Sequence, residues 1–178
     1  MIIQTDLYGF SGSSQAICTL GYPISLDGNQ NGGVNIDVGD IWPTANKAFF
    51  YPFTIYSPIT ISKAFILNAS AVSGNVDIGV YDKNGNRLGS TGQTVNAGTV
   101  ASQIINLTAD TLLSLPGYYY LAIAINNTTA RPQNQSQNVN LCKFLGYKEQ
   151  TSAFPLPNPA TMVEITAGYI PWVGLLLK

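Results

Sequence analysis

Residues 75–87 read NVDIGVYDKNGNR, and this stretch decides the fold. Two sets of side chains alternate along its first part: Val76, Ile78 and Val80 against Asp77, Gly79 and Tyr81. A period of two places the two sets on opposite faces of a β-strand. The pair Asn84-Gly85 follows, and its preference for positive φ suits a tight turn. The stretch therefore predicts an antiparallel hairpin.

Similar short runs recur from Lys47 onward at intervals of about ten residues, a spacing typical of an antiparallel β-sandwich. The runs cover residues 47–56, 58–68, 75–82, 87–91, 101–107, 118–126, 139–147 and 169–177. A count of about eight predicts an all-β fold, an antiparallel β-sandwich of the jelly-roll type. Residues 139–147 suit a short helix equally well, and both assignments stay open.

The same alternation predicts the core. The side chains expected to face it are Phe49, Tyr51, Phe53 and Ile55 in the first run, Ile59, Ile61, Phe65 and Leu67 in the second, and Tyr119, Leu121, Ile123 and Ile125 in the run 118–126. Pro52 lacks a backbone donor, so the first run is expected to contain an edge or a bulge.

The opposite face of the run 118–126 carries Tyr118 and Tyr120 beside small alanines. Such a row on a nearly uncharged sheet offers a platform for a sugar ring or for a neighbouring subunit. The alternative is that another segment covers this face. The candidate ligand-binding residues are Tyr118, Tyr120, Tyr81 and Trp42.

Two segments are expected to lie outside regular strands. Residues 108–115 are polar enough to predict a helical turn or a loop. The proline-rich residues 153–159 must be extended, because each proline fixes φ and disfavours helix before it. They are expected to cross the outside of the domain as a strap.

Residues 1–46 are rich in Gly, Ser, Asn and Gln, which opposes independent folding. They are predicted to form an extended arm that is ordered by contact with other chains, and residues 47–178 to form the sandwich. The first ten residues do not read as a secretory signal. If the protein works outside a bacterium, we therefore expect it to leave by lysis or to be carried in a particle.

Charged residues make up only 10% of the chain, and the formal net charge is -1. Lysines and arginines form no run, so nucleic acid is not an expected partner. The longest apolar stretch, residues 167–177, contains Pro171 and is shorter than the ~20 residues of a membrane span. A surface with few charges and many apolar residues predicts self-association, as a trimer or a larger ring.

The residue types argue against catalysis. The chain has no histidine, the commonest general base. Carboxylates that might meet in space are Asp37, Asp40, Asp77, Asp82, Asp110, Glu149 and Glu164, but none has a flanking catalytic signature. The chain is therefore expected not to be an enzyme and to need no cofactor.

One segment resembles the first half of a calcium loop, with Asp27, Asn29 and Asn31 as alternating oxygen ligands. The second half lacks the bidentate Glu, where Val38 stands, so a solvated turn is the preferred interpretation and calcium the alternative. Cys18 and Cys142 have no metal-site spacing. Buried thiols are favoured for both, and a disulfide between them is the alternative.

Four segments together resemble a known group of proteins: ANKAFFYPF (45–53), VSGNVDIGVYD (72–82), PGYYYLA (116–122) and SAFPLP (152–157). They resemble small tailed-bacteriophage virion and tail structural proteins, over residues 42–178. The resemblance implies a jelly-roll module on a phage particle, as a fibre, spike, decoration or adsorption component. The strand 76–82 also resembles those of carbohydrate-binding jelly rolls, which share a fold without sharing a ligand.

Two functions are therefore expected. The first is a bacteriophage virion structural protein that assembles through its arm and its sandwich with copies of itself and other virion proteins. The alternative is a glycan-binding module for host attachment.

Overall fold

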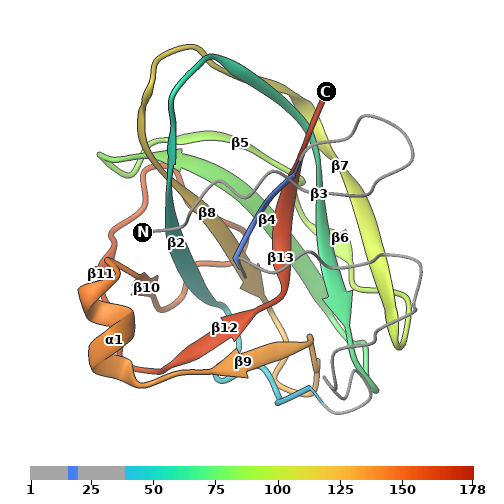
Figure 1. Ribbon diagram of the computed structural model, residues 1–178. Coiled ribbons are helices and arrows are strands. Elements are labelled where there is room, and N and C mark those ends of the chain that lie inside the picture. Colours follow the sequence, from blue (N-terminus) through green and yellow to red (C-terminus); the bar gives the residue numbers. More distant parts are fainter. Residues whose placement is uncertain (1–15, 20–38) are drawn as a thin grey trace, which may run out of the picture.

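The computed structural model describes residues 16–19 and 39–178, which form antiparallel sheets and one short helix (Figure 1). The larger sheet contains, in order, β11 (Val163–Glu164), β10 (Lys148–Gln150), β2 (Lys47–Ile55), β8 (Gly117–Ile125), β4 (Asn75–Asp82) and β5 (Arg87–Ser90), with β6 (Thr94–Val95) also paired to β4. The smaller sheet contains β1 (Ala16–Cys18), β13 (Val173–Leu177), β3 (Ile59–Asn68) and β7 (Ala101–Leu113). Strands β12 (Tyr169–Pro171) and β9 (Asn134–Ser136) pair separately, and the helix is α1 (Val139–Phe144).

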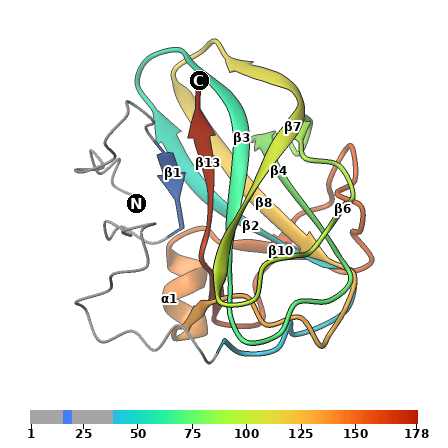
Figure 2. The same cartoon turned by 90° about the vertical axis from the view of Figure 1, so that its right-hand side faces the viewer.

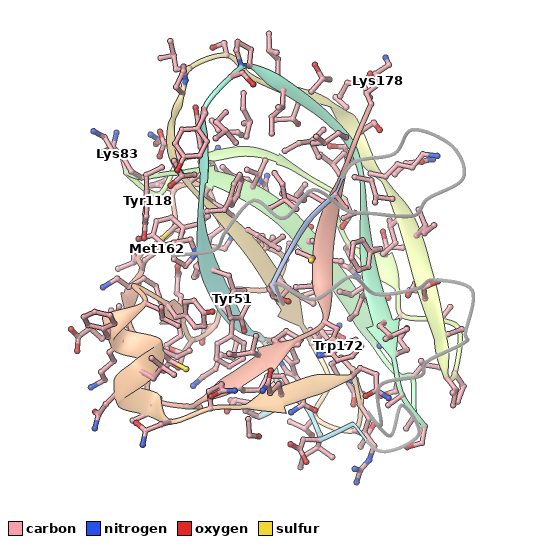
Figure 3. The ribbon with its side chains drawn as sticks, viewed as in Figure 1. Tyr51, Lys83, Tyr118, Met162, Trp172 and Lys178 are labelled. Atoms are coloured by element: carbon pink, nitrogen blue, oxygen red, sulfur yellow. The ribbon has the colours of Figure 1, made fainter. Side chains whose placement is uncertain are left out.

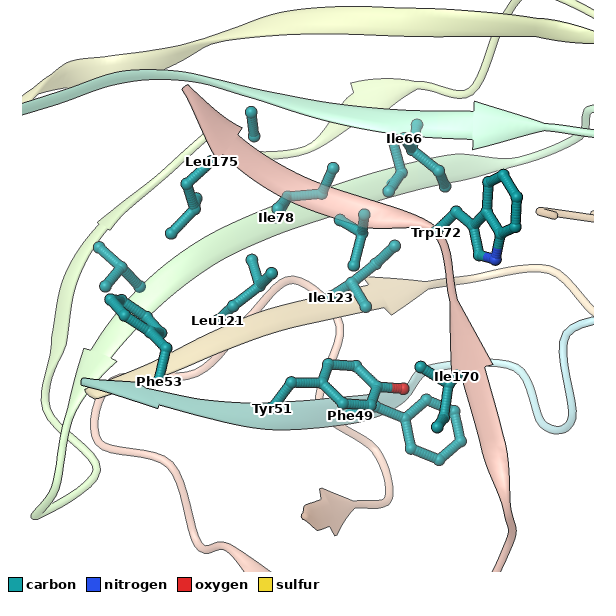
Figure 4. Close-up of a cluster of buried hydrophobic side chains, with 14 of the residues drawn as sticks. Phe49, Tyr51, Phe53, Ile66, Ile78, Leu121, Ile123, Ile170, Trp172 and Leu175 are labelled. Carbon is teal, nitrogen blue, oxygen red and sulfur yellow. The ribbon is translucent and has the colours of Figure 1, made fainter. Parts of the chain in front are cut away.

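The two main sheets enclose one apolar core (Figure 4). It contains Phe49, Tyr51, Phe53 and Ile55 of β2 together with Tyr119, Leu121, Ile123 and Ile125 of β8. Strands β3, β7 and β13 supply the side chains that face them. The predicted alternation in β2, β4 and β8 is confirmed, and with it an all-β sandwich-like fold.

Strand β8 lies in the interior of the larger sheet. It pairs with β2 over nine positions, from Lys47 opposite Ile125 to Ile55 opposite Gly117. On its other side it pairs with β4. Pro52 lies beyond the last residue of β2 that pairs with β10, so β2 has a free edge on that side at Pro52.

The hairpin between β4 and β5 is also confirmed. Asp82 donates its backbone N–H to Asn86 (3.0 Å), and Gly85 has a φ of 87°. The Asp82 carboxylate also accepts the backbone N–H groups of Asn84 and Asn86 at 2.8 and 2.9 Å. The turn is therefore fixed by an acidic residue as well as by its glycine.

The predicted face of β3 is wrong at Phe65, because the pairing register with β7 shifts between Ile61 and Lys63. Beyond this bulge Ala64 and Ile66 face the core. Phe65 stands on the opposite face of β3 and is paired in register with exposed Ile104 of β7. The Phe65 ring occupies the space that a side chain at Gly174 would need. A bulge exchanges the two faces of the strand that follows it.

Residues 108–113 belong to β7, so the predicted helical turn or loop is wrong there. Four residues of β7, 107–110, lie where β3 has only Ser62, between the pairs Ile61–Thr111 and Lys63–Asn106. The polar residues project from this irregular part of a strand. In contrast, residues 139–144 form a helix, capped by the Asn138 side chain, which accepts the N–H of Asn140 at 2.8 Å.

Part of the sequence assigned to the arm belongs to the body of the sandwich. Strand β1 pairs with β13, with Ile17 opposite Leu175 (Figure 2). Thr19 donates its hydroxyl to the carbonyl of Pro171 at 2.6 Å. The remainder of the predicted arm up to residue 38 lies outside the described residues, as do Asp27, Asn29 and Asn31.

We expect Ile123→Ala to lower the free energy of unfolding by about 2–5 kcal/mol, because the side chain is completely buried between the sheets. Ile104→Ala is the matched control, since it removes the same atoms from a residue that is 52% exposed. Urea denaturation of both variants measures the difference. Equal midpoints would contradict the assignment of β8 to the core.

Candidate functional site

Trp42 is completely buried in the core. Its ring packs edge-on against Phe49 and Tyr169, with centroids 5.3 and 5.5 Å away. Its backbone N–H donates to the carbonyl of Ala130 at 2.8 Å. A side chain enclosed in this way presents no ring face to a ligand, so Trp42 stabilises the sandwich.

The outer face of the larger sheet is covered by residues 153–162, which we call the strap. Tyr81 and Tyr120 lie beneath it in a second apolar cluster. The other members of the cluster are Ala48, Phe50, Ala122, Ala124, Ala153 and Leu156, with Phe154, Ala160 and Met162 packed against them. The predicted strap is therefore confirmed, and Tyr81 and Tyr120 are covered.

Polar contacts hold the strap to the sheet along its length. Tyr81 donates its hydroxyl to the carbonyl of Pro157 at 2.6 Å, and the Arg87 guanidinium donates to the carbonyl of Leu156. At one end Ala153 donates its N–H to Asn46, and towards the other end Ala160 donates to Gly85. The strap is thus tied to strands and to the β4–β5 hairpin.

One contact of the strap uses a buried carboxylate. Asp77, which is completely buried, accepts the N–H of Leu156 at 3.0 Å and lies 3.3 Å from the Thr91 hydroxyl. Burial raises the pKa of Asp77 above its usual value, against the lowering effect of these hydrogen bonds and of Arg87. The Asp77 carboxylate therefore holds the strap through the Leu156 N–H, although burial away from water disfavours its charged form.

Tyr118 is the exposed member of the four predicted aromatic residues, with 41% of its surface accessible. Its ring stands perpendicular to that of Tyr120, with centroids 5.2 Å apart. Figure 3 places it at one side of the sandwich, in the region of Met162 and Lys83. Burial and the neighbouring Tyr120 hydroxyl raise its pKa, so the phenol is neutral at physiological pH.

The described carboxylates from the sequence are dispersed, each with a different local partner. Glu149 forms a buried ion pair with Lys47 at 3.0 Å and accepts the Thr166 hydroxyl at 2.7 Å. Burial would raise the pKa of Glu149, but the hydrogen bonds from Thr166 and Lys47 lower it on balance. The other partners are Asn134 for Asp40, Leu156 for Asp77, Asn86 for Asp82, Lys178 for Asp110 and Lys143 for Glu164.

Cys142 is a free thiol buried in the core, as favoured from the sequence, and burial raises its pKa. Across residues 16–19 and 39–178, Cys, Asp and Glu side chains form no group of three that could hold a metal ion. The helix of this part of the chain is too short to cross a membrane.

An exposed apolar surface lies at one end of the sandwich, where two connections run between the sheets (Figure 1). Residues 56–58 join β2 to β3, and residues 114–116 join β7 to β8. They are neighbours because Ile55 pairs with Gly117 and Ile59 with Leu113. We call this surface the apolar tip; its members are Tyr56, Pro58, Leu112, Leu115 and Pro116.

The apolar tip is strongly exposed and has no charge of its own. Tyr56, Leu112 and Leu115 are 78%, 62% and 70% exposed. Residues 54–60 and 112–118 contain no charged side chain. The Tyr119 hydroxyl holds the connection from below, donating to the carbonyl of Leu115 at 2.7 Å. An exposed patch of this kind marks an interaction surface.

Sequence reasoning missed the apolar tip. Alternation separates the two faces of a strand, whereas four of the five members of the tip lie in connections, to which that pattern does not apply. One signal was present: large apolar residues stand beside Pro58 and Pro116, where turns usually carry polar residues.

No family model, curated protein or solved structure matches the chain. The candidate site therefore rests on the geometry of the chain itself. It consists of the apolar tip and of Tyr118, the two features that present aromatic or aliphatic groups to solvent at the ends of β2 and β8.

We expect the stability of the protein to decrease as the pH rises through the pKa of folded Asp77, which lies above the usual 3.8. The folded state binds the Asp77 proton more tightly than the unfolded state does. The stability that this proton contributes therefore begins to fall near the pKa of Asp77 in the unfolded state, and it is fully lost above the pKa of Asp77 in the folded state. Asp77→Asn does not titrate. The urea midpoint of the variant relative to that of the parent should therefore rise as the pH increases above about 4, the usual pKa of an aspartic acid. A difference in urea midpoint that does not change with pH would contradict the raised pKa of Asp77.

Proposed function

We propose that this chain is a non-enzymatic structural protein of a bacteriophage particle, a fibre, spike, decoration or adsorption component with a jelly-roll sandwich. The observation that carries its binding role is the apolar tip. Large uncharged side chains from two neighbouring connections project into solvent there. In a free monomer this surface is unfavourable, so it suits a contact with another chain.

The dispersed carboxylates support binding rather than catalysis. Each has its own structural partner, such as Lys47 for Glu149 and the Leu156 N–H for Asp77. Paired carboxylates of a hydrolase instead face each other across a substrate. We infer that the acidic side chains fix loops and the strap.

The proposed assembly is a homo-oligomer, a trimer or a larger ring, joined to other virion proteins. The uncharged tip can approach a second chain without the desolvation of ions. Residues 1–15 and 20–38 are proposed to dock the protein to the particle, which accords with their Gly- and Asn-rich sequence. No cofactor is part of the proposal, and calcium at Asp27, Asn29 and Asn31 remains an alternative.

A second candidate function is glycan binding for host attachment, which Tyr118 favours. Its ring is exposed, its orientation is fixed by Tyr120, and uncharged Thr54 lies opposite it on β2. A neutral aromatic face beside hydroxyl groups suits a sugar ring. The strap leaves Tyr118 as the accessible end of the predicted platform.

We expect Tyr56→Ser with Leu115→Ser to weaken self-association by about 100-fold, because two large exposed side chains lose the surface that a contact would bury. Sedimentation velocity measures the assembly. Val95→Ser with Ile104→Ser is the control, since these residues are similarly exposed at another place. A parent protein that remains a 19.0 kDa monomer at high concentration would contradict the assembly role.

For the glycan alternative, Tyr118→Ala should reduce binding on a glycan array about tenfold while the melting temperature changes little. The partial exposure of the ring is the reason for the small effect on stability. Tyr118→Phe is the matched control and should retain stacking. Failure of the parent protein to bind any glycan would exclude this alternative.

A further inference from the structure

Two buried asparagines, Asn68 and Asn96, carry polar atoms that lack a partner among the described residues. They are 0% and 4% exposed. The atoms are Oδ1 of Asn68 and both Oδ1 and Nδ2 of Asn96. Native proteins rarely leave a buried amide in this condition, because the amide has given up its hydrogen bonds to bulk water. The same part of the chain has three more such atoms, on Trp42, Gln133 and Trp172.

The two amides come from different sheets and turn toward the same interior. Asn68 ends β3, far from the apolar tip, and it lies on the same face of that strand as Ile66 of the core. Asn96 follows β6 and donates its backbone N–H to the carbonyl of Gly74 at 3.0 Å, which extends the pairing of β6 with β4. Because Val95 is 67% exposed, alternation turns the next side chain, that of Asn96, inward.

A hydrogen bond brings the two residues close together. Asn68 donates its Nδ2–H to the carbonyl of Ala97, the neighbour of Asn96, at 2.8 Å. This bond fixes the orientation of the Asn68 amide and leaves Oδ1 as its unpaired acceptor. In Asn96 both atoms are unpaired, so either orientation of its amide presents one donor and one acceptor.

The amides lie beside a strained connection between the sheets. Residues 96–100 join β6 to β7, and Val100 has a φ of 52°, which a β-branched residue rarely adopts. The Val100 N–H donates to the carbonyl of Ala69 at 2.9 Å, so the end of β3 holds the connection at both Ala97 and Val100. Such strain persists only where the surrounding contacts fix the backbone. Further contacts of Asn68 and Asn96 would strengthen that hold.

We propose that Asn68 and Asn96 bind internal water, which joins the two sheets at this end of the sandwich. One water molecule can donate to Oδ1 of Asn68 and accept from Nδ2 of Asn96, and a second can donate to Oδ1 of Asn96. Water fits because it satisfies donors as well as acceptors. A metal ion fits poorly, since it is bound by oxygen atoms and would leave Nδ2 of Asn96 unpaired.

A crystal structure of the parent protein, at a resolution that shows ordered water, tests the proposal directly. We expect density for a water molecule within hydrogen-bond distance of Oδ1 of Asn68 and of an amide atom of Asn96. A direct bond between the two amides would overturn the proposal. So would side chains that pack together without water, or a metal ion held by oxygen atoms alone.

The variant Asn96→Leu gives a second measurement whose sign decides. Leucine has nearly the shape of asparagine without its polar atoms. If the amide binds water, the variant leaves that water and Asn68 with a missing partner, and the melting temperature should fall by about 5 °C. If the amide is simply unpaired, its removal is favourable, and an unchanged or higher melting temperature would overturn the proposal. Asn106→Leu is the matched control at an exposed asparagine and should change the melting temperature little.

Discussion

The hydrogen bond from the Leu156 N–H to the buried Asp77 carboxylate is the contact on which the covering of the larger sheet's outer face by the strap depends. It joins the strap to β4, the first strand of the β4–β5 hairpin, across 79 positions of sequence. Without the strap, the face of β8 that carries Tyr120, Ala122 and Ala124 would be open. A buried carboxylate with specific donors fixes one position of the strap, which apolar packing alone would leave free to slide.

This contact also explains how a chain with so few charges forms an ordered surface. Its acidic residues are used at particular places: Asp82 fixes a turn, Glu149 neutralises Lys47, and Asp77 holds the strap. The remaining surface is supplied by amides, hydroxyls and apolar groups. The exposed apolar side chains of the described residues lie at several places, and the apolar tip is one at which three of them, Tyr56, Leu112 and Leu115, stand together.

Alternation predicted the parts of the fold where pairing is regular. It assigned β2, β4 and β8 to the core because no bulge interrupts their pairing with each other. It failed at Phe65, since a bulge cannot be read from side-chain types. It also failed at residues 108–113, since a polar stretch can remain in a strand whose extra residues bulge away from the partner. Of the candidate site, Tyr118 was predicted, whereas burial of Tyr81, Tyr120 and Trp42 depends on distant segments that no local pattern reveals.

The strap follows in the sequence the strands that it covers, and this order has a consequence during synthesis. The strands that it covers are complete once Ile125 has left the ribosome, but the strap ends at residue 162. At roughly 5–20 residues per second, the aromatic face of the nascent sheet stays uncovered for about 2–8 s. During that interval Phe50, Tyr81 and Tyr120 are exposed apolar surface on a chain that is still attached to the ribosome, close to other nascent copies. A chaperone that shields nascent chains would therefore matter most for this protein between the synthesis of Ile125 and that of residue 162.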